Sequence, residues 1–292
     1  MTNNDTRVFL YTILKLQWGY IVRQPGATAA QAAYILPPPT TVVGAYANPL
    51  ARILGVPDYA ERRRGGLPVR NKYMECLLAS TLAAGAGLVG LGAIRVGAVT
   101  YEEPARIMGT PYKSGGSYQK AVKQPIYLSA TELLPVQAAG AASAPGAVMA
   151  MAWLLDASRL EGCLRRSVST GDLERAAWGV YRLGSREGLA HPVEAGAIAG
   201  GALDEKDRGF YKSLLYQDSL CASREEGYTV QAALLGLDYR ERVYLVPSGL
   251  LGGANILTPP ERAPTFYLRP GCRAAGASVG GRGLELRLAY RG

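Results

Sequence analysis

The segment at residues 34–45, with the sequence YILPPPTTVVGA, constrains the fold of this chain more than any other stretch. Its three consecutive prolines lack backbone N–H groups and fix φ near the extended value, so no helix can run through them. The hydroxyl of Thr40 or Thr41 can then cap a helix, because apolar residues follow at helical spacing. We therefore predict a strand, a rigid extended entry and a helix that ends near Leu54.

The composition is that of a folded globular protein. The chain has 292 residues, of which 48% are hydrophobic and 19% are charged, enough for one large domain or two modest ones. The net charge of +9 favours a polyanionic partner. The basic residues gather in three stretches with few or no acids: residues 62–72, residues 113–123, and the tail after Glu261, which carries six arginines against Glu285.

Tyrosine is abundant, with 18 Tyr against 3 Phe. A tyrosine can stack on a base and also form a hydrogen bond, which suits a polar interface. Half-buried packing on strands would equally account for most of these side chains.

The four cysteines predict no zinc site. Cys76, Cys163, Cys221 and Cys272 form no C-x-x-C pair, and the one histidine, His191, has no thiol nearby in sequence. We expect buried reduced thiols, with disulfides as the alternative in a hyperthermophile.

Two long uncharged stretches, residues 76–94 and 133–155, are rich in Gly and Ala. Such side chains supply too little apolar free energy for a membrane span, so we predict core elements and no membrane partner. The first 16 residues lack the features of a signal peptide, and we expect a cytoplasmic protein.

The element pattern predicts an α+β fold. Strands are expected at residues 7–23, 93–101, 125–132 and 179–183, and helices to about residue 54 and at 71–84, 147–162 and 172–178, with a glycine turn between residues 85 and 92. The order strand–helix–strand–strand–helix–strand is that of a ferredoxin-like (RRM-like) domain, here residues 1–190. A smaller β-rich domain follows at 191–292, with strands expected at 242–246, 265–269 and 284–290. The aromatic RNP consensus is absent, so RNA stacked on an open sheet face is not predicted.

The insertion at residues 102–124 is the first candidate binding region. It alternates aromatic and basic residues around Gly115-Gly116, which suits a hairpin tip. Lysines of such a hairpin can hold phosphates while a tyrosine stacks on a base. A solvated loop is the alternative.

Two glycine-containing turns are the other candidates. In the run RLGSREG at residues 182–188, Arg182, Ser185 and Arg186 could form a phosphate nest, unless Arg186 merely pairs with a glutamate in an ordinary turn. In the run GGRG at residues 280–283, Arg282 could lie against an RNA backbone, or the run could simply be a tight turn.

Four sequence features together resemble the archaeal type I-A form of the fifth Cas family, within the CRISPR-associated RAMP superfamily. They are the N-terminal strand with Trp18-Gly19, the PPPTT-VVGA run, the helix with Lys72-Tyr73 and the RLGSREGL run, and the resemblance covers most of residues 6–190. The resemblance implies a subunit of the type I-A interference complex (Cascade) with a modified ferredoxin-like domain and a protruding hairpin, placed here at 102–124. It also implies capping of the five-prime handle of the CRISPR RNA, contacts with the repeating backbone subunit and the large subunit, and an indirect relation to target DNA.

We accordingly predict a non-catalytic RNA-binding subunit with no cofactor and no metal. The RNA-binding residues that we predict are Arg23, Thr40, Thr41, Tyr112, Lys113, Tyr118, Lys120, Lys123, Arg182, Ser185, Arg186 and Arg282.

The alternative is an endoribonuclease that processes CRISPR repeat RNA, because one branch of the wider family uses a Tyr, Lys and His set for that reaction. His191 is the one histidine available as a general base near pH 7. It precedes Pro192, and a lone histidine is more often structural. A scaffold without any nucleic acid is disfavoured by the distribution of charge.

Overall fold

The computed structural model describes residues 6–17, 19–20, 22, 34–56, 71–89, 141–142, 147–184, 188–249, 257–281 and 283–292. Its helices are α1 (Pro39–Leu54), α2 (Lys72–Ser80), α5 (Ala157–Leu164), α6 (Thr170–Trp178) and the short 3-10 helix η3 (Gly200–Ala202). Its strands are β1 (Arg7–Leu16), β2 (Gly19–Tyr20), β3 (Thr81–Val89), β4 (Ala141–Ala142), β5 (Val148–Asp156), β6 (Ala190–Ala199), β7 (Asp204–Lys206), β8 (Gly209–Lys212), β9 (Gln217–Asp218), β10 (Ala222–Glu226), β11 (Thr229–Leu235), β12 (Glu241–Pro247), β13 (Thr265–Leu268), β14 (Cys272–Val279) and β15 (Leu284–Arg291).

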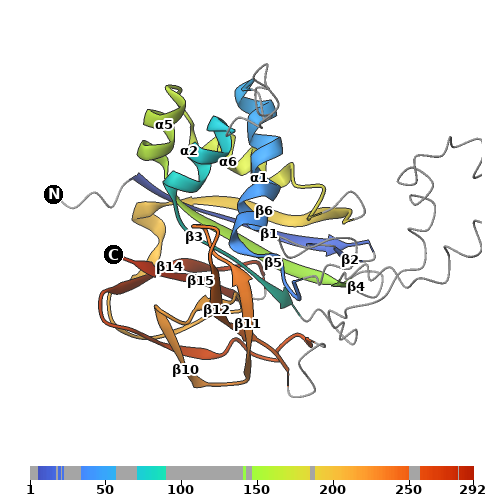
Figure 1. The fold of residues 1–292 in the computed structure, drawn as a ribbon, viewed down its shortest axis with the longest axis vertical. Coiled ribbons are helices and arrows are strands. Elements are labelled where there is room, and N and C mark those ends of the chain that lie inside the picture. Colours follow the sequence, from blue (N-terminus) through green and yellow to red (C-terminus); the bar gives the residue numbers. More distant parts are fainter. Residues whose placement is uncertain are drawn as a thin grey trace, which may run out of the picture.

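A four-stranded antiparallel sheet organises the molecule, with strand order β3-β5-β1-β6. The four α-helices lie on one face of this sheet, and the strands from β7 to β15 lie on the other (Figure 1). The mixed helix and sheet architecture confirms the predicted α+β class. Since β6 completes this sheet and runs to Ala199, the sheet continues past the domain boundary expected at residue 190.

Both faces of the sheet are buried. Along β5, Met151 and Trp153 belong to the core under the helices, whereas Ala152 and Leu154 belong to a second core shared with Leu215 and other residues of the C-terminal strands. The face that an RRM would offer to RNA is therefore covered. A strand buried on both faces has no polar alternation, which is why the helix predicted at 147–162 is wrong over β5 and correct only over α5.

The glycine turn predicted after residue 85 is also wrong, because Gly85 and Gly87 lie within β3. A Cβ built on Gly87 would lie 1.9 Å from the carbonyl oxygen of Leu214, and the Tyr216 N–H donates to Ala86 O at 3.0 Å. The glycines thus allow the C-terminal unit to reach the backbone of β3. The strands predicted at 93–101 and 125–132 lie outside the described residues.

Three further local predictions need correction. Helix α1 begins as predicted behind the prolines, but Pro38 is its N-cap and no side chain caps it, so neither threonine has the predicted capping role. The helix expected at 71–84 begins behind Asn71, which caps it, and ends at Ser80. The strand expected at 179–183 is absent; in its place Arg182 forms a single bridge to Leu189.

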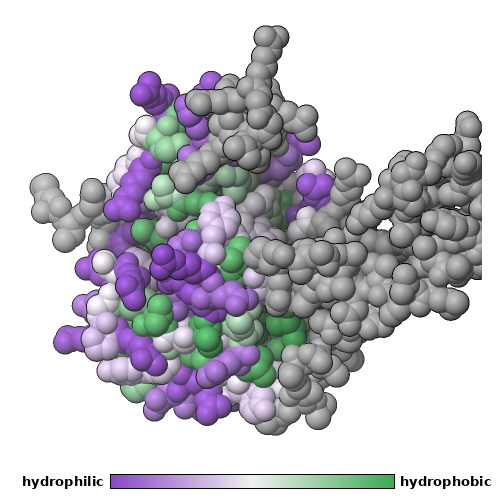
Figure 2. Space-filling view, in the orientation of Figure 1, coloured by the Kyte–Doolittle hydropathy of each residue, from purple (hydrophilic) through white to green (hydrophobic). Residues whose placement is uncertain are grey.

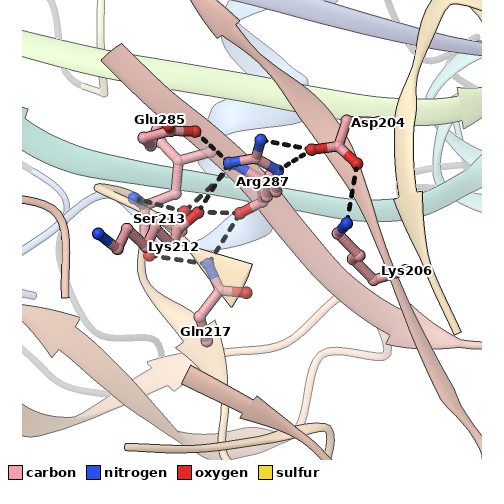
Figure 3. Close-up of polar contacts among 8 residues, drawn as sticks. Asp204, Lys206, Lys212, Ser213, Gln217, Glu285 and Arg287 are labelled. Atoms are coloured by element: carbon pink, nitrogen blue, oxygen red, sulfur yellow. Dashed lines mark hydrogen bonds and ion pairs between the residues drawn. The ribbon is translucent and has the colours of Figure 1, made fainter. Parts of the chain in front are cut away.

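The C-terminal unit is β-rich, as predicted, and contains three three-stranded sheets with orders β10-β13-β8, β11-β12-β9 and β15-β14-β7. Arg287 ties these strands together (Figure 3). Its guanidinium donates to Asp204 Oδ2 at 2.5 Å and 3.1 Å, to the Glu285 carboxylate and to the Lys212 carbonyl. The Gln217 amide donates in turn to the Arg287 carbonyl at 2.9 Å.

The prediction of reduced thiols is wrong. Cys76 and Cys163 form a disulfide between α2 and α5, and Cys221 and Cys272 form a second one, each with a Cα–Cα distance of 5.5 Å. The paired cysteines are 87 and 51 residues apart in the sequence, so no short spacing motif could predict the two disulfides. Each bond closes a long loop and restricts the unfolded chain accordingly.

In the view of Figure 2, hydrophobic residues form separate groups between hydrophilic ones over the described part of this face. No helix in the described part of the chain combines the length and the apolar character that a membrane crossing requires.

Candidate nucleic-acid interface

Because both sheet faces are covered, the ends and edges of the sheet remain for a ligand. At one end, the turn that enters β6 is held by a short ladder of backbone hydrogen bonds. Leu183 N donates to Gly188 O at 2.7 Å, Ala190 N donates to Tyr181 O at 3.0 Å, and Gln17 N donates to Leu189 O at 3.1 Å. The turn, which contains the predicted Arg182 site, is thus anchored to the end of β1.

Two arginines from different elements converge on one tyrosine in this region. The guanidinium carbons of Arg52, from the last turn of α1, and of Arg182 each lie 5.9 Å from the centre of the Tyr181 ring. Both arginines are exposed, and the Tyr181 side chain is 44% exposed. Within the described residues, neither arginine has a carboxylate at ion-pairing distance. Their positive charge is therefore available to an anionic ligand.

Lys15 and His191 lie opposite each other on β1 and β6, at the same end of the sheet, and both are exposed. Gln17 Nε2 lies 3.2 Å from His191 Nδ1. Lys15 lies between Leu14 and Leu16, which face the core under the helices, so the Lys15 side chain points to the opposite face of the sheet. We refer to Arg52, Tyr181 and Arg182 together as the β6 corner.

The Gly280–Gly283 turn reaches β6 as well. The turn is closed by a hydrogen bond of 3.0 Å from Gly283 N to Gly280 O. A Cβ on Gly280 would lie 2.8 Å from Glu194 Oε2, and its φ of +73° independently favours glycine. The structure thus brings the described residues of two of the three predicted regions, the turns at 182–188 and 280–283, to strand β6.

Glu194 also accepts a hydrogen bond of 3.4 Å from the Tyr11 hydroxyl. Burial, and after it the charge and the hydrogen bond of Glu194, raise the pKa of Tyr11. Tyr11 therefore stays a neutral donor at physiological pH, and the Glu194 carboxylate keeps a partner within the sheet.

The two predicted threonines do not join this corner. Thr40 and Thr41 lie half-buried in the first turn of α1, and a rise of 1.5 Å per residue puts them about 17 Å along the helix from Arg52. Near them, the Tyr216 hydroxyl donates to Pro37 O at 2.9 Å, which fixes this end of the helix to the C-terminal unit. The remaining predicted residues lie outside the described part of the chain: Arg23, Tyr112, Lys113, Tyr118, Lys120, Lys123, Ser185, Arg186 and Arg282.

Sequence reasoning missed Arg52 and Tyr181. Arg52 stands in the last turn of a predicted helix, where a basic residue is commonly explained by the helix dipole. Tyr181 directly precedes Arg182, and an aromatic residue beside an arginine at a candidate phosphate turn was the available signal. Their proximity to each other depends on the packing of α1 against α6, which no local pattern reveals.

Comparisons with known proteins give one informative match. No protein-family model matches the chain, and no curated protein matches it in sequence. A crystal structure of a CRISPR protein from Archaeoglobus fulgidus superimposes over 98% of this chain and 99% of its own, with a TM-score of 0.57 and 14% sequence identity. A chain of a type III-B Cmr-beta complex, determined by cryo-electron microscopy with cognate target RNA and AMPPnP, covers 86% of each chain at 12% identity, but its TM-score of 0.29 is too low to support an argument. The first match shows that this chain shares the fold of that CRISPR protein.

Proposed function

We propose that this chain is a CRISPR RNA-binding subunit of a CRISPR interference complex and that it does not itself cleave RNA. One observation carries the proposal: the exposed Arg52 and Arg182, without ion-pair partners among the described residues, converge on the exposed Tyr181 at the end of a sheet with covered faces. The fold shared with a CRISPR protein supports the biological setting.

The chemistry of the β6 corner suits an RNA backbone. A guanidinium can donate two parallel hydrogen bonds to a phosphate, and the Tyr181 ring can stack on a neighbouring base. The anchored turn holds Arg182 in place before RNA arrives, so less conformational entropy is lost on binding.

We further propose the specific role of a type I-A subunit that caps the five-prime handle of the CRISPR RNA and contacts the backbone and large subunits. The strand order β3-β5-β1-β6, with helices on one face, supports a modified ferredoxin-like RAMP domain. The hairpin that the sequence predicts for this role, at residues 102–124, lies outside the described residues. Target DNA is then contacted indirectly, through the assembled complex.

Arg182→Lys tests the proposal. Lysine keeps the charge but cannot form the two-pronged phosphate contact, so we expect the Kd for handle RNA to rise about tenfold with the melting temperature almost unchanged. Fluorescence anisotropy with labelled RNA and a thermal melt measure the two quantities. Arg175→Lys is the matched control, because Arg175 is exposed and paired with Asp172. A lowered melting temperature with unchanged RNA affinity would make Arg182 a structural residue and refute the proposed site.

The endoribonuclease alternative has one specific observation in its favour, the position of Lys15 opposite His191. A lysine and a histidine at that spacing could share the proton transfers of RNA cleavage. We expect purified protein to leave repeat RNA intact on a denaturing gel, with and without divalent metal. Cleavage that is lost in both His191→Ala and Lys15→Ala would establish the alternative.

A further inference from the structure

The outward face of the sheet β10-β13-β8 carries a pair of exposed aromatic rings. Phe210 on β8 lies opposite Tyr267 on β13, and their ring centres are 5.4 Å apart with an interplanar angle of 60°. Their side chains are 55% and 41% exposed, respectively, although rings of this size are normally buried. Two contacting rings open to solvent offer stacking faces to a ligand.

The sheet beneath these rings is rigid. On its inner face, Tyr211 and Phe266 are buried and stack with ring centres 5.7 Å apart. The Cys221–Cys272 disulfide lies in the same core, and the Arg269 N–H donates to the Cys221 carbonyl at 2.9 Å. The backbone under the exposed pair is therefore fixed before any ligand binds.

The residues around the two rings are polar and include basic and acidic side chains. Ser223 lies opposite Tyr267, and Lys212 lies opposite Thr265, two positions along the same strands. The side chains of Lys212 and of Arg269, which follows β13, are exposed and have no ion-pair partner in the described part of the chain. The Glu226 carboxylate accepts a hydrogen bond of 3.4 Å from the Thr265 hydroxyl, and Glu225 beside it on β10 is also exposed.

A cavity adjoins this surface at Lys212. It has a volume of about 330 Å³, and its lining includes the basic Lys212 and Arg262 and the acidic Glu261 and Glu285. Arg262 thus adds a second basic side chain on this side of the rings, next to two carboxylates.

We propose that this face binds single-stranded RNA, and we call Phe210, Tyr267, Lys212, Arg269 and Ser223 the aromatic platform. Phe210 and Tyr267 stack on bases, and Lys212 and Arg269 hold the phosphates on either side. The Ser223 and Tyr267 hydroxyls provide partners for ribose 2′-OH groups, which favours RNA over DNA. A protein partner fits less well, because the apolar area is limited to two rings among polar residues, whereas a stable protein interface has a larger apolar core.

This platform is separate from the β6 corner. Its strand β10 lies at the far end of the molecule from the helices (Figure 1). The inference depends on the geometry of β8, β10 and β13 and stands independently of the proposed function.

Fluorine NMR on the full chain, with 4-fluorophenylalanine in place of phenylalanine, tests the platform directly. The chain has three phenylalanines, and Phe9 and Phe266 are fully buried, so Phe210 alone is open to a ligand. We expect titration with a twelve-nucleotide oligouridine to shift the Phe210 signal and to leave the other two in place. The shift should persist in Arg52→Gln/Arg182→Gln, which lacks the basic side chains of the β6 corner. An unmoved Phe210 signal at saturating RNA would overturn the proposal.

Affinity measurements on variants separate stacking from other contacts. Phe210→Leu keeps an apolar side chain without a ring, and we expect about tenfold weaker oligouridine binding, whereas Phe210→Tyr should bind like the wild type. Oligothymidine DNA and duplex RNA should bind more weakly than the single-stranded RNA. Unchanged binding by Phe210→Leu, or equal binding of the DNA, would contradict the assignment, and the former would favour a protein partner for this face.

Discussion

At the scale of single residues, contacts far apart in sequence decide what a glycine does. The neighbouring glycines led to the prediction of a turn at Gly87, yet Gly87 lies in strand β3. A glycine is needed there because the carbonyl of Leu214 lies against its Cα. A side chain at this position would have to displace the backbone of Leu214, which cannot rotate out of the way as the end of a flexible side chain can.

Gly87→Ala should therefore destabilise the protein by about 3 kcal/mol, the cost of overpacking a tight core. Gly44→Ala is the matched control, because a Cβ there meets nothing within 4 Å and alanine favours helix α1 by about 0.5–1 kcal/mol. Chemical denaturation measures both free energies of unfolding. Equal free energies of unfolding for the two variants would show that the backbone of Leu214 is not in close contact with β3 at Gly87.

Residues of the candidate site could be predicted from the sequence only where they belong to a short local motif. Arg182 follows from its turn, and Gly184 adopts a φ of +74° that suits glycine. Arg52 and Tyr181 could not be predicted, since their meeting depends on how two helices pack. Thr40 was assigned to the RNA site from its neighbourhood in sequence, and the length of α1 separates it from the corner.

At the scale of elements, the Arg287 network shows how charge orders the C-terminal strands (Figure 3). Burial alone would raise the pKa of Asp204, but the hydrogen bond and charge of Arg287 outweigh it and hold that pKa below its usual range. A carboxyl group with a lowered folded-state pKa stabilises the protein above its ordinary pKa near 3.8, and this stabilisation is lost as the pH falls through the folded-state value.

Asp204→Asn should therefore lower the melting temperature at pH 7, and the difference from the wild type should shrink steadily below about pH 4. Asp207→Asn, at an exposed neighbouring position, is the control and should change little at either pH. Differential scanning fluorimetry across the pH range gives the comparison. A deficit in Asp204→Asn that is as large at pH 3 as at pH 7 would exclude the ion pair as its source.

Element prediction succeeded where one face is polar. Helix α6, predicted at 172–178, buries one face and has a capping box between Ser169 and Asp172. Strand β15, predicted at 284–290, also has partly exposed positions between its buried ones. β5 was missed because the helices cover one of its faces and the C-terminal unit covers the other, which leaves a uniformly apolar run.

At the scale of the whole molecule, the helices cover one face of the central sheet and the C-terminal strands cover the other. A ligand of this sheet would therefore have to bind at its ends or edges. The net charge of +9 predicts a polyanionic partner but not where it binds. Among the described residues, the exposed cations without ion-pair partners include those of the β6 corner and those beside the aromatic platform. Two disulfides brace the helical layer and the C-terminal unit, respectively.

The salt dependence of RNA binding tests the central claim, that Arg52 and Arg182 contact phosphates. In a plot of log affinity against log salt, each phosphate contact to a single strand contributes about 0.7 to the slope, so Arg52→Gln/Arg182→Gln should flatten the slope by about 1.4. Arg159→Gln/Arg175→Gln, which removes two exposed arginines already paired with Asp156 and Asp172, should keep the wild-type slope. A wild-type slope in the Arg52/Arg182 variant would contradict the account and place the RNA elsewhere on the molecule.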